Sequence, residues 1–320
     1  MERTVFRQVL SVRTEILQVQ SEGLAGAPLL HLVVIPGNPG APTFYRQFVL
    51  TLLSSLGSTP ARIEVVGHAG HSRGALSRAE ADEGGPVYSL DFQTEHKARY
   101  VGSLVSGLHR STRLVLLGHS IGGLIAARLA VRGELESHVG RVVHLMSTVQ
   151  RLEEGLHPLI RHFALSRPGL FSMGVMARLV PLSVLQACLA ARASDPQDPA
   201  AQQQNAFILH GFLSRTVIHN VLYMARTEVR DVVELPLALF PPQAVRRSLF
   251  LFAPEDPYTP PHLIARLAQA IPDARILQTS PEVPHAFVGC RDAIIQVCMM
   301  IVADLVREGY VSRLMGDSKL

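Results

Sequence analysis

The chain contains no tryptophan, only 6% aromatic residues and three cysteines in 320 residues. Cys188, Cys290 and Cys298 are far apart and lack metal-site spacing, so we expect a reducing compartment and no disulfide framework. No uninterrupted apolar run reaches the 18 residues or more of a membrane-spanning helix. Charged residues interrupt the N-terminus where a secretory signal needs an apolar stretch. We therefore predict neither a transmembrane helix nor a secretory signal.

Charged residues of either sign are also few, at 18% of the chain, and the formal net charge is +4. The arginines are scattered rather than gathered in a stripe, which argues against nucleic-acid binding. Hydrophobic residues make up 48%, and the mean hydropathy is +0.23. This length allows one large α/β domain or a core domain with an insertion, and the weakly basic, apolar composition is compatible with an anionic lipid surface.

Residues 114–128 form the stretch around which the chain is organised. Four apolar residues predict a buried strand, Gly-x-Ser-x-Gly follows at residues 118–122, and an Ala- and Leu-rich helical pattern comes next. In a nucleophile elbow the serine is strained, and small residues such as Gly118 and Gly122 must flank it. We predict such an elbow at Ser120. The alternative is an exposed serine in a tight turn between strand and helix.

Strands and helices alternate along most of the sequence. Buried strands are predicted at residues 29–35, 62–66, 114–117, 142–146, 247–252 and 274–277, and helices at 45–56, 92–108 and 261–270. Residues 4–20 suit one or two edge strands, and residues 73–88 resemble a surface loop. The alternation implies βαβ units and an α/β fold with a mostly parallel sheet covered by helices on both faces.

This alternation stops between residues 150 and 245, where prolines separate apolar helical pieces. We interpret the segment as a helical cap inserted into the core. The predicted domains are a first core part (1–149), the cap (150–245) and a second core part (246–320).

A serine hydroxyl needs a general base within hydrogen-bond reach, and that base needs an orienting carboxylate. In α/β-hydrolases the three occur in the chain order serine, acid, histidine. After Ser120, Asp256 lies in the turn that follows the strand at 247–252, and His285 lies in the loop that follows 274–277. We predict that these three residues form a catalytic triad.

Glu255 competes with Asp256 for the acid position because the two are adjacent. We favour Asp256, since the turn proline Pro257 follows it directly. The alternative is that Asp256 is only a turn residue and His285 only a loop histidine, and for either residue considered alone this would be the better interpretation.

An oxyanion hole needs two backbone N–H groups aimed at the developing charge. One is expected from Ile121, and the other from the loop after the 29–35 strand. The prolines of this loop have no N–H, which leaves those of Gly37, Asn38, Gly40 and Ala41. We choose Asn38, which follows a Pro-Gly in the place of the more usual His-Gly; the alternative is that the loop is only a tight turn.

The remaining histidines rank lower. We expect His119 to pack beneath the serine, and His68 and His71 to face the active-site edge of the sheet. No Asp or Glu completes a metal site near this pair, so we predict no metal and no cofactor.

Several short motifs match one family in order. They are Val34-Ile35-Pro36-Gly37-Asn38-Pro39-Gly40 with Phe44-Tyr45, His68-Ala69-Gly70-His71, Gln93 with Glu95-His96-Lys97, Gly118-His119-Ser120-Ile121-Gly122, Asp256-Pro257 and Pro284-His285-Ala286-Phe287. Over residues 30–290 the chain resembles the lipid droplet-associated hydrolase family. The resemblance implies an α/β-hydrolase fold with Ser120, Asp256 and His285 as triad. It also implies residence on lipid droplets and the endoplasmic reticulum, and hydrolysis of sterol or other acyl esters.

The cap contains strongly apolar stretches at residues 156–160 and 169–190. Arg178 and Pro181 interrupt the second, and a spanning helix would bury the arginine at roughly 2.5–3.5 kcal/mol. Two interpretations stay open: an interfacial helix or shallow hairpin on a lipid monolayer, and a cap helix packed over the acyl site.

Our leading hypothesis is a serine hydrolase that cleaves sterol or glycerol esters through an acyl-enzyme. It would act as a peripheral protein on the lipid droplet or the cytosolic face of the endoplasmic reticulum. A droplet-binding or tethering protein with little turnover and an acyltransferase with the same triad are the alternatives.

Overall fold

The computed structural model describes residues 1–24, 26–156 and 214–312. The expectations for residues 169–190, and for most of the predicted cap, lie outside these residues. The statements below concern the described residues.

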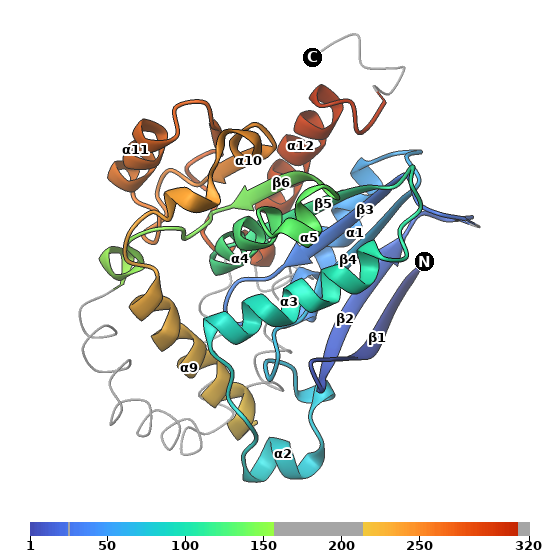
Figure 1. The fold of residues 1–320 in the computed structure, drawn as a ribbon, viewed down its shortest axis with the longest axis vertical. Helices are drawn as coiled ribbons and strands as arrows, with labels where there is room; N and C mark the ends of the chain where they lie inside the picture. The colour runs from blue at the N-terminus through green and yellow to red at the C-terminus, as the bar shows by residue number, and fades with distance from the viewer. Residues whose placement is uncertain (25, 157–213, 313–320) are drawn as a thin grey trace.

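One eight-stranded sheet forms the centre of the fold (Figure 1). Its strands are β1 (Glu2–Val9), β2 (Val12–Gln20), β3 (Leu30–Ile35), β4 (Ala61–Val66), β5 (Arg113–His119), β6 (Val139–Leu145), β7 (Ser248–Phe252) and β8 (Arg275–Gln278). Their order across the sheet is β1-β2-β4-β3-β5-β6-β7-β8. β1 pairs with β2, and β2 with β4, in antiparallel fashion, and the strands from β4 to β8 are parallel.

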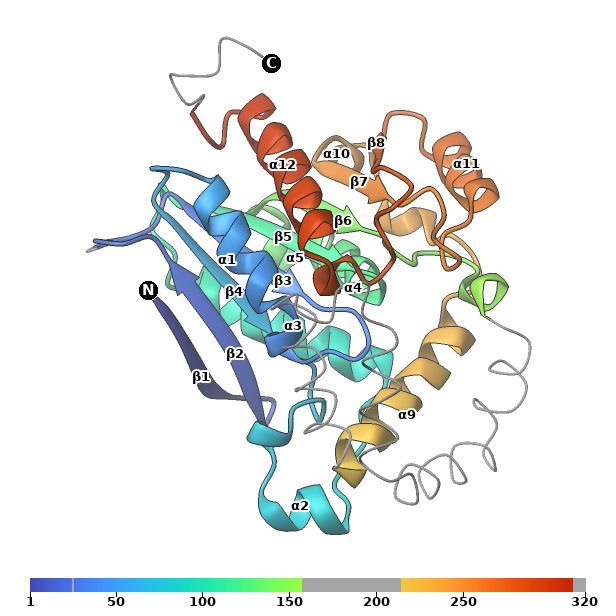
Figure 2. The ribbon, with the colours of Figure 1, turned by 180° about the vertical axis from the view of Figure 1, so that it is seen from behind.

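Helices cover both faces of the sheet. The helices of four residues or more are α1 (Arg46–Ser55), α2 (Arg78–Glu83), α3 (Leu90–Val105), α4 (Ile121–Ala130), α5 (Gly133–Glu136), α9 (Arg215–Asp231), α10 (Pro242–Arg246), α11 (Pro261–Ala270) and α12 (Arg291–Arg307), with the 3-10 turns η1 (Pro42–Tyr45) and η3 (Leu152–Gly155). α3 and α4 lie on the face seen in Figure 1, and α1 and α12 lie together on the opposite face, seen in Figure 2.

The parallel strands are buried on both sides, which explains their continuous apolar sequences. Alternate side chains enter two different clusters because successive residues of a strand point to opposite faces. Leu32 and Val34 of β3 pack in the cluster that includes α1 and α12. Val33 and Ile35 pack in the cluster that includes α3 and α4. The prediction of a mostly parallel sheet with helices on both faces is confirmed.

Two local expectations need correction. Residues 73–88 are not only a surface loop, because α2 forms there with a capping box between Ser77 and Glu80. Residues 4–20 belong to two strands, but only β1 is an edge strand, because β2 also pairs with β4. Short-range patterns do not reveal the second partner of a strand.

α9 is the longer of the two described α-helices between β6 and β7. It packs against α2 and α3 and is seen at the lower left of Figure 1. The division into core and cap domains stays a prediction. No helix in the described part of the chain is long and apolar enough to cross a membrane.

Candidate active site

Ser120 lies at the sharp turn between β5 and α4. Its backbone has φ 53° and ψ −125°, a conformation that a side chain adopts only under strain. A Cβ atom at Gly118 would lie 2.4 Å from the Gly122 carbonyl oxygen, and one at Gly122 would lie 2.2 Å from the Ile35 carbonyl oxygen. Only glycine fits at both positions. The predicted strand, strained turn and helix are all present.

The structure brings Ser120, His285 and Asp256 together from three separate loops. His285 Nε2 lies 3.0 Å from Ser120 Oγ, and His285 Nδ1 lies 2.6 Å from Asp256 Oδ2. An ionised carboxylate only accepts hydrogen bonds, so Nδ1 carries the proton and Nε2 accepts from the serine hydroxyl. The imidazole is therefore arranged to take a proton from Ser120.

Asp256 is fixed by its own turn. Its carboxylate accepts hydrogen bonds from the Tyr258 N–H and from Thr259 Oγ1, both at 2.8 Å. Burial alone would raise the pKa of Asp256, but hydrogen bonds, first of all from His285, outweigh burial and hold this pKa below its ordinary value. The neighbouring Glu255 is exposed, and the carboxylate bonded to His285 Nδ1 is that of Asp256.

His119, the residue before the serine, ties three parts of the site together. Its Nε2 lies 2.9 Å from the carbonyl oxygen of His285, and its Nδ1 lies 2.7 Å from Tyr45 Oη. Burial lowers the pKa of His119 to about 3, so the ring is neutral, with Nε2 donating to the carbonyl and Nδ1 accepting from the tyrosine. Tyr45 Oη in turn accepts from the Gly37 N–H at 2.7 Å. His119 thus connects the turn at Ser120, the loop that contains His285 and the loop after β3.

Hydrogen bonds in the loop after β3 narrow the choice of oxyanion donor. The Gly37 N–H is bonded to Tyr45, and the Gly40 N–H donates to His71 Nδ1 at 3.1 Å. Of the two remaining candidates, Asn38 lines the cavity that contains Ser120, whereas Ala41 does not. This agrees with the choice of Asn38, whose role as an oxyanion donor stays a proposal.

The loop after β4 packs against the loop after β3, which contains Asn38. His68 and His71 are buried there, and the His68 N–H donates to the Gly40 carbonyl oxygen at 2.9 Å. A Cβ atom at Gly40 would lie 2.1 Å from His68 Cδ2, so the two loops are in close contact. Burial lowers the pKa of His71 to about 3, which keeps its Nδ1 free to accept the Gly40 N–H.

α3 in turn holds the loop after β4. The Gln93 side chain pairs with both the N–H and the carbonyl oxygen of Ala69 at 2.9 Å. Lys97 Nζ donates to the Gly67 carbonyl oxygen at 2.9 Å and lies 3.1 Å from His96 Nδ1. The motif around residues 93–97 therefore acts structurally, as a support of the loop behind the site.

A cavity of about 560 Å³ opens above Ser120. Most of its described lining is apolar, including Leu152, Leu156, Val229 and Val288. The polar lining groups are those of the site, with one further carboxyl group from α9, Glu228. A cavity of this kind suits an apolar ligand with one reacting polar group.

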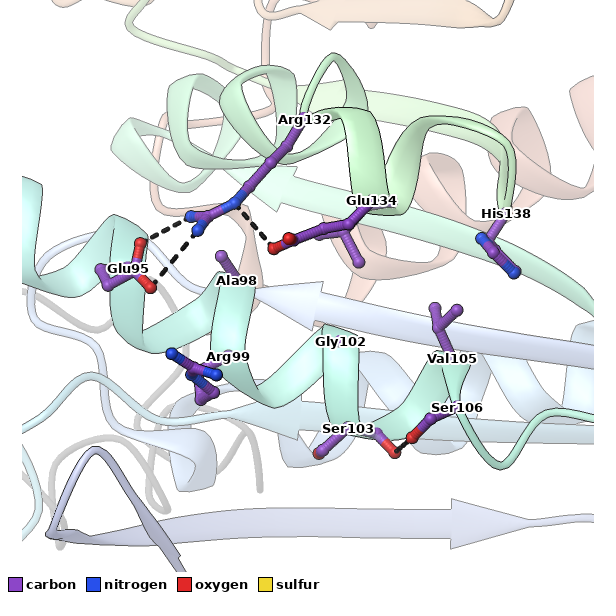
Figure 3. Close-up of a pocket in the computed structure, with 11 residues that line it drawn as sticks. Glu95, Ala98, Arg99, Gly102, Ser103, Val105, Ser106, Arg132, Glu134 and His138 are labelled. Atoms are coloured by element: carbon purple, nitrogen blue, oxygen red, sulfur yellow. Dashed lines mark hydrogen bonds and ion pairs between the residues drawn. The ribbon is translucent and has the colours of Figure 1, made fainter.

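A second depression, of about 760 Å³, lies between α3 and the turn that contains α5 (Figure 3). Arg132 at its rim forms ion pairs with Glu95 and Glu134, as the dashed lines in Figure 3 indicate. It shares no lining residue with the cavity at Ser120. Its charges neutralise one another, and we assign it no function.

No group of three or more His, Cys, Asp or Glu side chains in the described residues is arranged to hold a metal ion. His68 and His71 lie close together, with ring centroids 5.3 Å apart, but they face the Gly40 loop.

Sequence reasoning missed two residues of this site. Tyr45 stands out in the sequence only as part of a motif, and its hydrogen bond with His119 at the end of β5 appears only in the folded chain. Glu228 gave no signal in the sequence, because nothing local relates α9 to the loop after β3. Its side chain is bonded to Asn38 across 190 residues of sequence.

Comparison with known proteins identifies similar sequences. The family model described as lipid-droplet associated hydrolase matches residues 28–288. The lipid droplet-associated hydrolase of Dictyostelium discoideum is 27% identical, over 86% of this chain and 87% of that protein. The protein of the same name from Gallus gallus is 28% identical, over 82% of this chain and 80% of that protein.

Solved structures show the same fold. A haloalkane dehalogenase from Agrobacterium tumefaciens superposes with a TM-score of 0.65 at 14% identity, covering 96% of this chain and 97% of that one. A serine hydrolase from Cycloclasticus zankles superposes with a TM-score of 0.64 at 14% identity, covering 97% and 99%. These similarities establish the α/β-hydrolase fold.

Proposed function

Because the chain belongs to the lipid droplet-associated hydrolase family, we propose that this hydrolase is a serine esterase that cleaves acyl esters of apolar lipids. The proposal depends on one observation: two consecutive hydrogen bonds connect Ser120 Oγ to His285 and His285 to Asp256. This arrangement turns a poor nucleophile into one that loses its proton as it attacks.

The proposed reaction has two steps. Ser120 Oγ attacks the ester carbonyl carbon while its proton moves to His285 Nε2, and the N–H groups of Asn38 and Ile121 receive the oxyanion. The proton then passes to the leaving alcohol oxygen, and the acyl group remains on Ser120. A water molecule, deprotonated by His285, attacks the acyl carbon. The bond from that carbon to Ser120 Oγ then breaks, His285 returns the proton to Ser120 Oγ, and the acid is released. Asp256 orients the ring and stabilises its charged form throughout.

The apolar lining of the cavity supports an acyl chain or a sterol as the buried part of the substrate. Sterol and glycerol esters are the substrates we propose. The names of the relatives associate those proteins with lipid droplets. By analogy we propose that this chain works as a peripheral protein at the droplet surface, or at the cytosolic face of the endoplasmic reticulum.

Labelling with a fluorophosphonate probe tests the serine chemistry. The wild-type protein should label and hydrolyse a soluble short-chain p-nitrophenyl ester, and Ser120→Ala should abolish labelling and lower kcat at least about 10⁴-fold. Asp256→Asn should lower kcat roughly 10³–10⁴-fold, since the ring loses its orientation and tautomer. Glu255→Gln is the matched control and should retain wild-type activity. A folded wild-type protein that never labels would contradict the proposal.

The tethering and acyltransfer alternatives predict different results. If Ser120→Ala restores droplet size and number in depleted cells as well as the wild type does, the protein acts mainly by binding. If added alcohols yield new esters faster than water yields acid, the enzyme is an acyltransferase. Lipid analysis after incubation of droplet lipids with wild type and Ser120→Ala identifies the acyl donor in either case.

A further inference from the structure

Glu228 is a carboxyl group in the active-site cavity that the proposed mechanism does not use. It lies near the end of α9, its residue is only 6% exposed, and it lines the same cavity as Ser120 and His285. Serine esterase chemistry needs one acid, and Asp256 supplies it. A second, buried carboxyl group so near the reacting atoms requires its own explanation.

The contacts of Glu228 lead to the loop after β3. Asn38 Nδ2 donates to Glu228 Oε1 at 3.1 Å and to the Val221 carbonyl oxygen at 2.9 Å. Both N–H bonds of the amide are thus used, and both acceptors belong to α9. The side chain of Asn38 therefore fixes its own backbone relative to α9.

The surroundings of Glu228 favour an uncharged carboxyl group. Among the described residues, its hydrogen-bond partner is Asn38, and no basic side chain forms an ion pair with it. Burial raises the pKa of Glu228 to about 8, although the hydrogen bond from Asn38 acts in the opposite direction. The other titratable groups around the cavity are Tyr45, His119, Tyr258 and His285. His119 is neutral and His285 is engaged with Asp256, so none of them offers a free cation.

We propose that Glu228 is a positioning residue of the oxyanion hole, which holds the Asn38 amide while uncharged and opposes the reaction once ionised. The inference rests on the proposed function. In its acid form Glu228 fixes Asn38 through Oε1 without adding charge to the cavity. In its carboxylate form it places a negative charge beside the group that must receive the negative oxyanion, and solvent screens this repulsion less at a buried group than at the surface.

The test is the pH dependence of kcat and KM for a soluble short-chain p-nitrophenyl ester, measured on the full chain. Wild-type kcat should fall about tenfold per pH unit above about pH 8, because only the acid form is active. Glu228→Gln imitates the acid form and should keep kcat within about threefold of wild type at pH 7, with no fall on the alkaline side. Glu228→Ala leaves Asn38 without this acceptor and should lower kcat about 10- to 100-fold with little change in KM.

Asp231→Asn is the matched control, because Asp231 lies on the same helix, outside the cavity, in an ion pair with Arg230. It should keep the wild-type alkaline fall. The inference is overturned if Glu228→Gln keeps that fall, or if Glu228→Ala leaves kcat unchanged. Should Glu228→Ala fail to fold, the comparison of Glu228→Gln with wild type still decides.

Results that contradict the proposed function differ from results that contradict only the Glu228 inference. In that case the wild type, Glu228→Gln and Asp231→Asn would all fail to react with a fluorophosphonate at every pH, and both proposals would fall together. Labelling that is lost in Ser120→Ala but has the same pH dependence in wild type and Glu228→Gln overturns the Glu228 inference alone.

Discussion

Arg141 and Lys97 are both basic side chains without solvent exposure, yet their surroundings differ completely. Arg141, near the start of β6, pairs through two nitrogens with Asp304 of α12 at 2.7 and 2.8 Å. Arg275 Nε lies 3.1 Å from the same carboxylate. We call these three residues the Arg141 cluster. The buried ion pair between Arg141 and Asp304 connects α12 to the sheet.

The Lys97 cluster, made of Lys97, His96, His71 and His68, lies at the opposite end of the parallel strands, behind the Asn38 loop. None of the described carboxylates forms an ion pair with Lys97, and burial lowers its pKa well below the ordinary value. The pKa values of the three histidines are lowered by burial as well. Lys97 and His71 form hydrogen bonds with backbone groups, and His96 contacts the Thr14 hydroxyl and Lys97, so the described contacts of the cluster include no carboxylate.

The comparison shows two ways to bury basic groups. An ion pair keeps its charges but depends on both partners, because either charge alone is costly in the core. The Lys97 cluster contains no carboxylate, so the loss of one member removes hydrogen bonds but leaves no buried carboxylate without its partner. Three changes test this difference.

The largest effect is expected from Arg141→Met, which leaves the carboxylate of Asp304 buried with only Arg275 near it. The free energy of unfolding should fall by about 3–5 kcal/mol, measured by urea denaturation. Arg141→Met combined with Asp304→Leu should recover most of this loss, because the charge that then lacks its partner, Arg275, is about one-third exposed to solvent. If Arg141→Met lowers the free energy of unfolding by less than about 1 kcal/mol, the ion pair does not stabilise the fold.

A smaller loss is expected from Lys97→Met, which removes a donor but strands no charge. The Gly67 carbonyl oxygen and His96 Nδ1 lose a partner, so unfolding should become easier by about 1–3 kcal/mol. Under the proposed function, kcat for a p-nitrophenyl ester should also fall, because the loop after β4 that contacts Gly40 loses a hydrogen bond. Arg99→Met, an exposed position on the same helix, is the control and should change neither quantity. If Lys97→Met costs as much stability as Arg141→Met, the distinction between the clusters is wrong.

The smallest effect concerns acid stability. His71 stays neutral in the folded protein down to a pKa of about 3, whereas the unfolded chain takes up a proton near the ordinary value of 6.5. The unfolded state therefore binds more protons as pH falls from 6.5 to 5.5, and over this one pH unit the free energy of unfolding decreases by about 1 kcal/mol from this group. His71→Gln should lose less stability over this range, measured by thermal or urea unfolding at several pH values. If the free energy of unfolding of wild type and His71→Gln depends on pH in the same way, His71 does not contribute to the loss of stability in acid.

Much of the core could be predicted because its signals are local. The apolar strands, the helices between them and the glycines around Ser120 all follow from residues within a few positions of one another. Asp256 and His285 could be selected because each follows a predicted strand, and parallel strands end at one edge of the sheet. Glu255 and Asp256 could be separated only weakly, since adjacent residues share the same local signals. Their orientation decides between them, and that orientation depends on the turn through Tyr258 and Thr259.

Local sequence signals predict the chain order of strands and helices, the strained turn at Ser120 and the residues available for acid and base. The folded arrangement establishes which N–H groups of the loop after β3 are already bonded, that Lys97 is buried beside histidines, and that Glu228 contacts Asn38. The physical reason is the range of the interactions. Backbone conformation is fixed by neighbouring residues, whereas burial and side-chain contacts join separate segments, such as Gly40 with His71 across 31 residues and Asn38 with Glu228 across 190.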